Sequence, residues 1–446
     1  MSGVSDPISI STKQDRIAKL AKQMPDRALW SLSQHIDIEW LKEAHRRTRK
    51  NAAPGVDGKT AEDYEQDLEG NLERLLEAAK AGTYRAPPVR RVQIPKGGGK
   101  TRPLGIPTHE DKVLQRAVKM VLEPIYEQVF YDFSYGFRPG RSAHQALEVL
   151  WEGLMSKRVA WVLDVDVQSF FDTLDHQICR EMLSKRVSDG VIVRLIGKWL
   201  NAGVLEGGVV RRPESGTPQG GVISPLLANI YLHEVLDEWW VRDVQPRMRG
   251  EAFLIRYADD FVICFEREDD AKKVQAVLSQ RFEKYGLNLH PDKTRLLPFA
   301  RPRGDARSQG GPDSARSFDF LGFNHHWAKT RRGGQAVQRS TMKSRFSRTV
   351  KAIADWLRRH LHEPLAVQAK AIGDRLRGFD GYYGITGNYR ALVRLRRAIE
   401  WIWWRRLCRR SQLGYIRWEY FYRVILARFP MPRPRVVHSA YRSAKL

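Results

Sequence analysis

Two adjacent aspartates between two apolar segments are the feature that most constrains this chain. Residues 253–257 (FLIRY) and 261–265 (FVICF) are rich in β-branched and aromatic side chains, which predicts a hairpin with the turn Ala258-Asp259-Asp260. Aspartate is also common in ordinary turns. Here, however, an apolar strand on each side would project both carboxylates from one edge of a buried sheet, and a divalent cation would relieve their repulsion. We therefore predict a metal site at this turn.

A second apolar segment supplies a third carboxylate. Residues 159–167 predict a strand that carries Asp164 and Asp166 near its end. Strand alternation places both aspartates on the same face, so the spacing leaves both as candidates. Carboxylates from two strand ends can hold two Mg²⁺ ions, or Mn²⁺ in their place. One ion would activate a 3′-hydroxyl and the other would stabilise a leaving pyrophosphate.

Charge is distributed unevenly along the chain. The 446 residues carry a net charge of +25. Residues 301–446 hold 32 Lys and Arg against 9 Asp and Glu, which gives +23 there and leaves +2 for residues 1–300. Aromatic residues are interleaved with these arginines, for example at Trp401, Trp403 and Trp404. Phosphate contact combined with stacking is typical of nucleic-acid surfaces, so we expect the last third to bind nucleic acid.

Periodicity predicts the other elements. We expect helices over 1–50, 60–82, 111–129, 177–202, 226–241 and 271–285, a strand hairpin at 90–94 and 102–106, and a strand at 318–323. Residues 301–316 read as a loop. Beyond Arg331 the pattern is almost entirely helical, over 340–361, 364–377 and 389–411, with a break at 378–388. The helix at 389–411 has to bury one stripe of its aromatic and aliphatic side chains.

Several classes of protein are excluded by composition. The chain has no run of 18 apolar residues, so we expect no membrane span. Its start lacks the apolar stretch of a secretory signal. The cysteines Cys179, Cys264 and Cys408 lie far apart and form no CxxC pair, which argues against a zinc ribbon. A reducing bacterial cytoplasm fits this usage.

Seven sequence blocks resemble the reverse transcriptase family, and they occur in the family's order. The blocks are 101–107 (TRPLGIP), 135–142 (YGFRPGRS), 166–176 (DVQSFFDTLDH), 215–231 (SGTPQGGVISPLLANIY), 257–260 (YADD), 289–294 (LHPDKT) and 320–323 (FLGF). The resemblance selects Asp166 over Asp164 and implies that Asp166, Asp259 and Asp260 are the catalytic metal ligands. It also implies an α+β right-hand polymerase with fingers, a mixed or antiparallel palm sheet, a helical thumb and a small all-helical maturase domain.

The bacterial group II intron subtype is the most similar. Residues 54–58 (PGVDG) resemble its extra N-terminal block, and 381–388 (GYYGITGN), 405–412 (RRLCRRSQ) and 432–438 (PRPRVVH) resemble its maturase domain and ending. The paired cysteines and HNH core of the longest members are not among these residues, so we expect the form without that endonuclease domain. The implied domains are an N-terminal extension (1–60), fingers and palm (61–326), thumb and maturase domain (327–425) and a basic tail (426–446).

The resemblance also assigns roles to individual residues. Phe171 would stack under the sugar and exclude a 2′-hydroxyl, and its alternative is a core aromatic. Gln219 would contact the incoming nucleotide near its 3′-hydroxyl. Lys96 and Arg102 would grip the triphosphate, with Lys100 as the rival of Lys96. Lys293 would protonate the pyrophosphate, or is a solvated lysine. Arg405, Arg406, Arg409 and Arg410 would bind RNA.

These roles imply particular partners. They are the group II intron RNA, an RNA template with a DNA primer, dNTPs and target DNA; no oligomeric state is predicted. The enzyme would copy RNA into DNA and assist the splicing and mobility of its intron by target-primed reverse transcription. Two alternatives are a reverse transcriptase adapted to antiviral defence or DNA repair, and an RNA-binding splicing factor without polymerase activity.

Overall fold

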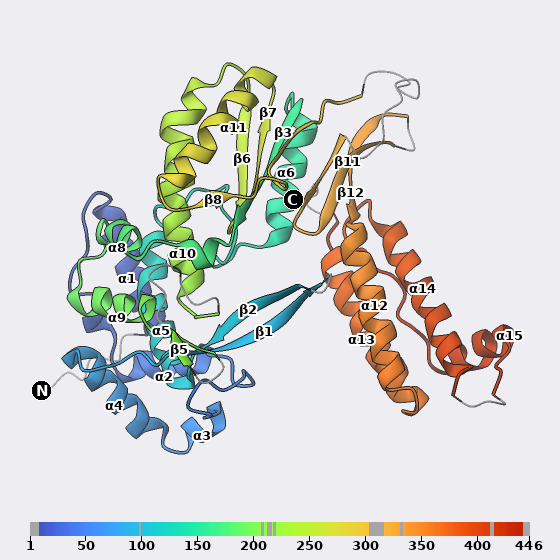
Figure 1. The fold of residues 1–446 in the computed structure, drawn as a ribbon, viewed down its shortest axis with the longest axis horizontal. Coiled ribbons are helices and arrows are strands. Elements are labelled where there is room, and N and C mark those ends of the chain that lie inside the picture. The colour runs from blue at the N-terminus through green and yellow to red at the C-terminus, as the bar shows by residue number, and fades with distance from the viewer. Residues whose placement is uncertain are drawn as a thin grey trace, which may run out of the picture. The chain divides into compact units, whose positions relative to one another are not determined.

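A computed structural model describes residues 9–97, 100–206, 209–211, 216, 220–302, 316–330, 333–410 and 414–439. The chain divides into two compact units. The first comprises residues 1–146, 165–261 and 269–295, and the second comprises 147–164, 262–268 and 296–446. The structure is mixed helix and strand, as expected for an α+β polymerase (Figure 1). Within the described residues no helix is long and apolar enough to cross a lipid bilayer.

Helices of the first unit surround one long buried helix, α5 (His109–Tyr126). Its apolar residues Val113, Ala117, Val121 and Ile125, four positions apart, are fully buried. Trp40 donates a hydrogen bond to the Ala117 carbonyl at 3.0 Å and so ties α2 to α5. Apart from α6, which is given below, the other helical segments up to residue 247 are α1 (Ile10–Gln23), η1 (Ser33–His35), α2 (Ile38–Arg47), α3 (Ala61–Glu65), α4 (Leu68–Ala81), α7 (Phe170–Thr173), α8 (His176–Ser184), α9 (Gly190–Leu200), α10 (Ser224–Leu232), η2 (His233–Asp237), η3 (Trp240–Val244) and η4 (Gln245–Arg247).

The hairpin predicted from residues 90–94 and 102–106 is confirmed. Strands β1 (Val89–Gly97) and β2 (Lys100–Ile106) pair antiparallel, with Ile94 opposite Arg102, and form the long ribbon in Figure 1. The short strands β4 (Val204–Glu206) and β5 (Val209–Arg211) extend this sheet in the order β2-β1-β4-β5. The pairing of β1 with β4 is parallel, so the sheet is mixed.

A second sheet carries the aspartates. Its order is β6 (Ala252–Tyr257), β7 (Asp260–Phe265), β3 (Trp161–Gln168) and β8 (Asn288–Leu289), and β9 (Arg295–Pro298) also pairs with β3. Helix α11 (Glu268–Glu283) packs on the sheet through Phe282, whose ring stacks on Phe261 at 6.0 Å between centroids. The predicted strands and the predicted aspartate hairpin are therefore confirmed.

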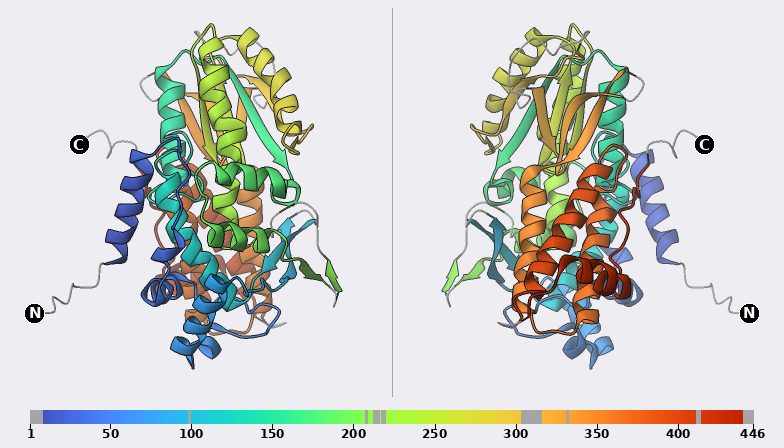
Figure 2. Two further views of the ribbon diagram at one scale, coloured as in Figure 1. Left: turned by 90° about the vertical axis from the view of Figure 1, so that its left-hand side faces the viewer. Right: turned by 90° about the vertical axis from the view of Figure 1, so that its right-hand side faces the viewer.

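The second unit contains a meander and a helical bundle. Strands β10 (Ser317–Phe320), β11 (Phe323–Lys329) and β12 (Gln335–Thr341) form an antiparallel sheet. Helices α12 (Lys343–Arg359), α13 (Leu365–Tyr383) and α14 (Tyr389–Leu407) share a core that includes Ile353, Ile372 and Ile399 (Figure 2). The remaining helical elements are α6 (Ala143–Ser156), α15 (Trp418–Tyr420), η6 (Phe421–Ile425) and α16 (Leu426–Arg428).

Several details of the sequence prediction were wrong. The segments expected to be helical over 1–50, 60–82 and 177–202 are each interrupted: they hold α1, η1 and α2, then α3 and α4, and then α8 and α9. The third interruption arises because Asp189 caps the start of α9 by accepting from the Val191 and Ile192 amides. The helix expected over 226–241 is confirmed, although it passes into the π-helical segments η2 and η3. Helix α13 continues through most of the expected break. Residues 335–341 form a strand, although the pattern beyond Arg331 was expected to be almost entirely helical. The alternation of apolar and polar residues is not visible in the sequence, because the buried pair His325 on β11 and Arg339 on β12 is polar.

Candidate active site and basic helix

The aspartate turn has a strained backbone. Strand β6 ends at Tyr257 and β7 begins at Asp260, so Ala258 and Asp259 make the connection. Ala258 is buried and has φ of +57°, in the left-handed region that a side chain disfavours. Glycine would adopt this conformation more easily. The surrounding structure therefore holds the turn in place, and with it the two carboxylates.

Asp259 lies in an electrostatic environment made by three charged residues. Burial raises the pKa of its carboxyl, the charges of Arg102 and Arg256 lower it, and the neighbouring Asp166 raises it further; the net shift is upward. The first unit thus brings Asp166 and Asp259 close enough to repel each other, as the sequence predicted. A cation at the site would relieve this repulsion.

Asp166 is held by the turn that follows β8. The Lys293 ammonium lies 2.7 Å from Asp166 Oδ2, and both side chains are about half exposed. The backbone is fixed as well, because the His290 amide donates to the Asp166 carbonyl at 2.8 Å. Asp164 is buried with 9% exposure. This contrast in exposure supports Asp166 as the ligand.

Arg102 on β2 is the predicted triphosphate-binding residue whose charge reaches the aspartates. Its side chain is exposed on β2, and its charge acts on Asp259. Lys96 and its rival Lys100 have described backbones in β1 and β2, but their side chains lie outside the described residues. Gln219 also lies outside them.

The two ends of the segment around Gln219 pack against elements of the site. Gly216 donates its amide to the Leu174 carbonyl at 2.8 Å and has φ of +91°. A Cβ on Gly220 would meet the Gly105 carbonyl oxygen on β2 at 2.4 Å. These glycines therefore allow close approach to the chain's own backbone. The contact of Gln219 with an incoming nucleotide stays a prediction.

Phe171 is buried just after β3. It is 8% exposed and lies edge-to-face with Phe170, at 5.5 Å between ring centroids. The preceding Ser169 has φ of +49°, which turns the chain sharply out of the strand and into α7. The ring thus combines near-complete burial with a position five residues after Asp166.

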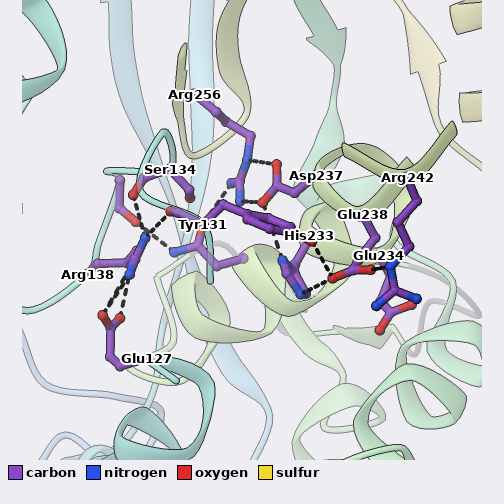
Figure 3. Close-up of polar contacts among 12 residues, drawn as sticks. Glu127, Tyr131, Ser134, Arg138, His233, Glu234, Asp237, Glu238, Arg242 and Arg256 are labelled. Carbon is purple, nitrogen blue, oxygen red and sulfur yellow. Dashed lines mark hydrogen bonds and ion pairs between the residues drawn. The ribbon is translucent and has the colours of Figure 1, made fainter. Parts of the chain in front are cut away.

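A buried ion pair behind the turn was missed by the sequence analysis. Arg256 on β6 and Asp237 at the end of η2 both have fully buried side chains and face each other in Figure 3. The arginine Nε donates to Asp237 Oδ1 at 2.8 Å. One signal was available: an arginine in the centre of an apolar strand needs a partner when it is buried.

The donor chemistry at the turn fits a divalent cation. Asp166, Asp259 and Asp260 offer carboxylate oxygens, the ligands that Mg²⁺ and Mn²⁺ prefer. Within the described part of the chain, however, no three His, Cys, Asp or Glu side chains gather tightly enough to form a preassembled metal site. Lys293 neutralises one of the Asp166 oxygens in this arrangement.

The four arginines at the end of α14 divide into two kinds. Arg405, Arg406 and Arg409 line a pocket of about 150 Å³ together with Ala354, Trp401 and Ile402. The Arg405 guanidinium lies 4.6 Å from the centroid of the Trp401 ring, which is 48% exposed. Arg410 instead donates to the backbone carbonyls of Leu361, at 2.7 Å, and Glu363, and so closes the end of α12.

The aromatic residues around this pocket also divide. Trp403 and Phe421 are fully buried, and with Leu392, Leu395, Ile399 and Leu407 they form the predicted buried stripe of α14 and its contacts. Trp401, Trp418, Tyr420 and Tyr422 stay exposed. Among the described residues, Arg405, Arg406 and Arg409 have no carboxylate partner. The helix therefore presents unneutralised charge beside accessible rings.

Comparison with known proteins identifies the family. The family described as "Reverse transcriptase (RNA-dependent DNA polymerase)" matches residues 94–325. The chain is 36% identical over 324 residues to Protein YkfC of Escherichia coli (strain K12), and the match covers 64% of this chain and 84% of that protein.

Two further relatives are longer proteins. Group II intron-encoded protein LtrA of Lactococcus lactis subsp. cremoris is 38% identical over 226 residues, which is 50% of this chain and 37% of LtrA. An uncharacterized 91 kDa protein in the cob intron of Schizosaccharomyces pombe is 26% identical over 380 residues, covering 71% of this chain and 46% of that protein. The chain thus spans less than half the length of these two relatives. With a family match over more than half of its residues, the chain belongs to the reverse transcriptase family of RNA-dependent DNA polymerases.

Proposed function

We propose that this reverse transcriptase serves a group II intron: it binds the intron RNA to assist splicing and copies that RNA into DNA from a target-DNA primer. The observation that supports this proposal most is that Asp166 and Arg102 lie close enough to Asp259 for their charges to shift the pKa of its carboxyl. The similarity to LtrA, named as group II intron-encoded, supports the partner.

In the proposed reaction, a primer 3′-hydroxyl attacks the α-phosphorus of a dNTP and pyrophosphate leaves. When bound by Asp166, Asp259 and Asp260, two Mg²⁺ or Mn²⁺ ions would supply electrostatic stabilisation of the attacking and leaving oxygens. Arg102, with Lys96, would hold the triphosphate, and Gln219 would orient the nucleotide. Phe171 would close the pocket against a 2′-hydroxyl.

Lys293 has a distinct part in this proposal. Its ammonium lies 2.7 Å from Asp166 Oδ2. A lysine in that position can transfer a proton to the departing pyrophosphate, which lowers the cost of expelling a highly charged leaving group.

The RNA-binding part of the proposal rests on α14. Arg405, Arg406 and Arg409 surround the pocket without carboxylate partners among the described residues, and Trp401 offers a ring for stacking. Folded RNA is recognised through phosphates and unstacked bases, which this combination fits. In domain terms, residues 61–326 would act as fingers and palm, and 327–425 as thumb and maturase domain.

Two assays test the proposal. The purified chain should extend a DNA primer on an RNA template with dNTPs and Mg²⁺, and it should accelerate splicing of a group II intron RNA that it binds. Extension without intron splicing would favour a reverse transcriptase adapted to another task. Splicing without extension would favour an RNA-binding splicing factor without polymerase activity.

A further inference from the structure

Arg256 is a charged residue in the interior of the first unit. Its side chain is fully buried. In the sequence it follows the apolar residues Leu254 and Ile255 and stands just before the aspartate turn. Removing a guanidinium from water is costly unless the group is paired and all its donors are used. The hydrogen bonds of the Arg256 guanidinium therefore indicate the structural role of this buried charge.

The guanidinium connects three segments. Nε donates to Asp237 Oδ1 at 2.8 Å, and Nη2 donates to Asp237 Oδ2. Nη1 donates to Asn229 Oδ1 at 3.0 Å and to the Ala258 carbonyl at 3.2 Å. Burial raises the pKa of Asp237, but the charges and hydrogen bonds of Arg256 and His233 together outweigh it, so the pKa lies below its ordinary value and the pair is ionic.

The Ala258 carbonyl belongs to the strained residue directly before Asp259. Gly136 packs directly against the turn, because a Cβ at this glycine would lie 2.3 Å from the Ala258 amide nitrogen. Asn229 fixes Gly136 in this position, because its Nδ2 donates to the Gly136 carbonyl at 2.6 Å. Arg256 and Asn229 thus form one hydrogen-bonded bracket around the left-handed Ala258.

We propose that Arg256, oriented by Asp237 and Asn229, is a positioning residue that holds the strained Ala258 turn and so fixes where the Asp259 carboxylate points. The inference rests on the proposed role of Asp259 as a metal ligand. Because the Arg256 side chain is fully buried and reaches the turn at the Ala258 carbonyl, its effect on catalysis would pass through the backbone of the turn.

A second buried arginine, Arg186, shows that a buried guanidinium need not contact the aspartate turn. Arg186 is 7% exposed and donates to the backbone carbonyls of Ala21, Met24, Pro25 and Arg27. It anchors the N-terminal segment and makes no contact with the aspartate turn. It is therefore a matched control for the loss of a buried guanidinium within the same unit.

The first test compares Arg256→Lys with Arg186→Lys in the full chain. Lysine keeps the charge but lacks the planar fork that reaches Asp237, Asn229 and the Ala258 carbonyl together. At saturating dNTP, Arg256→Lys should lower kcat at least tenfold, while the KM for dNTP and the Kd for primer–template stay within about threefold. Arg186→Lys should lose a comparable amount of Tm and less than threefold in kcat.

The second test uses the strain itself. Glycine adopts positive φ without the Cβ penalty, so Ala258→Gly should restore at least threefold of the kcat lost in Arg256→Lys and none in Arg186→Lys. Equal kcat losses in the two lysine variants, or equal recovery of both by Ala258→Gly, would overturn the proposal. A wild-type chain that extends no primer would instead refute the proposed function.

Discussion

Lys293 Nζ lies 2.7 Å from Asp166 Oδ2, so a lysine from the turn after β8 contacts a carboxylate that stands near the end of β3. The two residues are 127 positions apart in the sequence. Their contact joins the block 289–294 to the block 166–176, and it places a proton donor beside a proposed metal ligand. Each residue of this pair therefore has its partner in the other block.

Lys293→Met should lower kcat about 100-fold, because positioned acid catalysis contributes factors of about 10² to 10⁴. The KM for dNTP should change little, since the ammonium acts on the leaving group. Single-nucleotide extension measures both quantities. The control is Lys284→Met, because Lys284 is an exposed lysine directly after α11. A kcat for Lys293→Met equal to that of the control would return Lys293 to a solvated surface charge.

Asp259→Ala or Asp260→Ala should abolish cDNA synthesis and leave RNA affinity within a few-fold, because these carboxylates bind metal and not phosphate. Primer extension measures the first effect and filter binding of RNA the second. Glu283→Ala, an exposed acid on α11, controls for the change in net charge. Loss of RNA binding by a folded aspartate variant would contradict the assigned role.

Phe171→Val should raise incorporation of ribonucleotides relative to deoxynucleotides, because a smaller side chain leaves room for a 2′-hydroxyl. Competing rNTP and dNTP in single-turnover extension measures the ratio. Phe170→Leu is the matched control, since Phe170 is buried against Phe171 and its truncation loosens the same core. If both variants polymerise with the wild-type ratio, Phe171 is a core aromatic only.

Replacing Arg405, Arg406 and Arg409 with Gln should weaken intron RNA binding and flatten its dependence on salt. Each phosphate contact contributes a log–log slope of about 0.7 to 0.9, so the loss of three contacts should lower the slope by up to about 2 to 3. Arg410 is left intact because it caps the end of α12 through Leu361 and Glu363. Extension on a short annealed primer–template should change little.

The control for this triple variant replaces Arg348, Arg377 and Arg390, which are exposed on α12, α13 and α14 and lie outside the pocket. It removes the same charge. Melting curves establish that both triple variants are folded, because arginine stems also cover apolar surface. Equal affinity and equal salt slope in the two variants would make the pocket arginines an ordinary solvated face.

Asp111 should make the stability of the first unit depend on pH. Burial raises its pKa from 3.8 to about 6, against hydrogen bonds from Tyr84, Trp199 and Gln115 that lower it. A raised folded-state pKa contributes stability that is complete below about pH 4 and is lost as pH rises to about 6. The stability of wild type relative to Asp111→Asn should therefore fall by at most about 3 kcal/mol across this window.

Urea unfolding of both proteins at several pH values between 4 and 7 measures this difference, and comparing the two proteins cancels the titration of other groups. Asp189→Asn is a useful contrast, because backbone hydrogen bonds lower the pKa of Asp189 although its burial raises it. Its stabilisation should be present above about pH 4 and be lost as the pH falls further, so urea unfolding of Asp189→Asn and wild type is extended below pH 4. A pH-independent difference between wild type and Asp111→Asn would show that Asp111 is ionised throughout.

The sequence by itself determined the elements whose signal is local. The apolar runs on both sides of Asp259 and Asp260 specify a hairpin, and a four-residue apolar period specifies α5, since these patterns follow from backbone geometry. The ordered blocks also determined the family. Charge counting located the polycationic third, because composition does not depend on how the chain folds.

Only the tertiary structure decided which distant residues act together. Lys293 beside Asp166, Asn229 against Gly136, and Arg410 at the end of α12 are contacts between segments far apart in the chain. The strands holding His325 and Arg339 were hidden for the same reason: their polar side chains are buried by partners that no local pattern contains. A buried charge is stable only with its partner, and the fold chooses that partner.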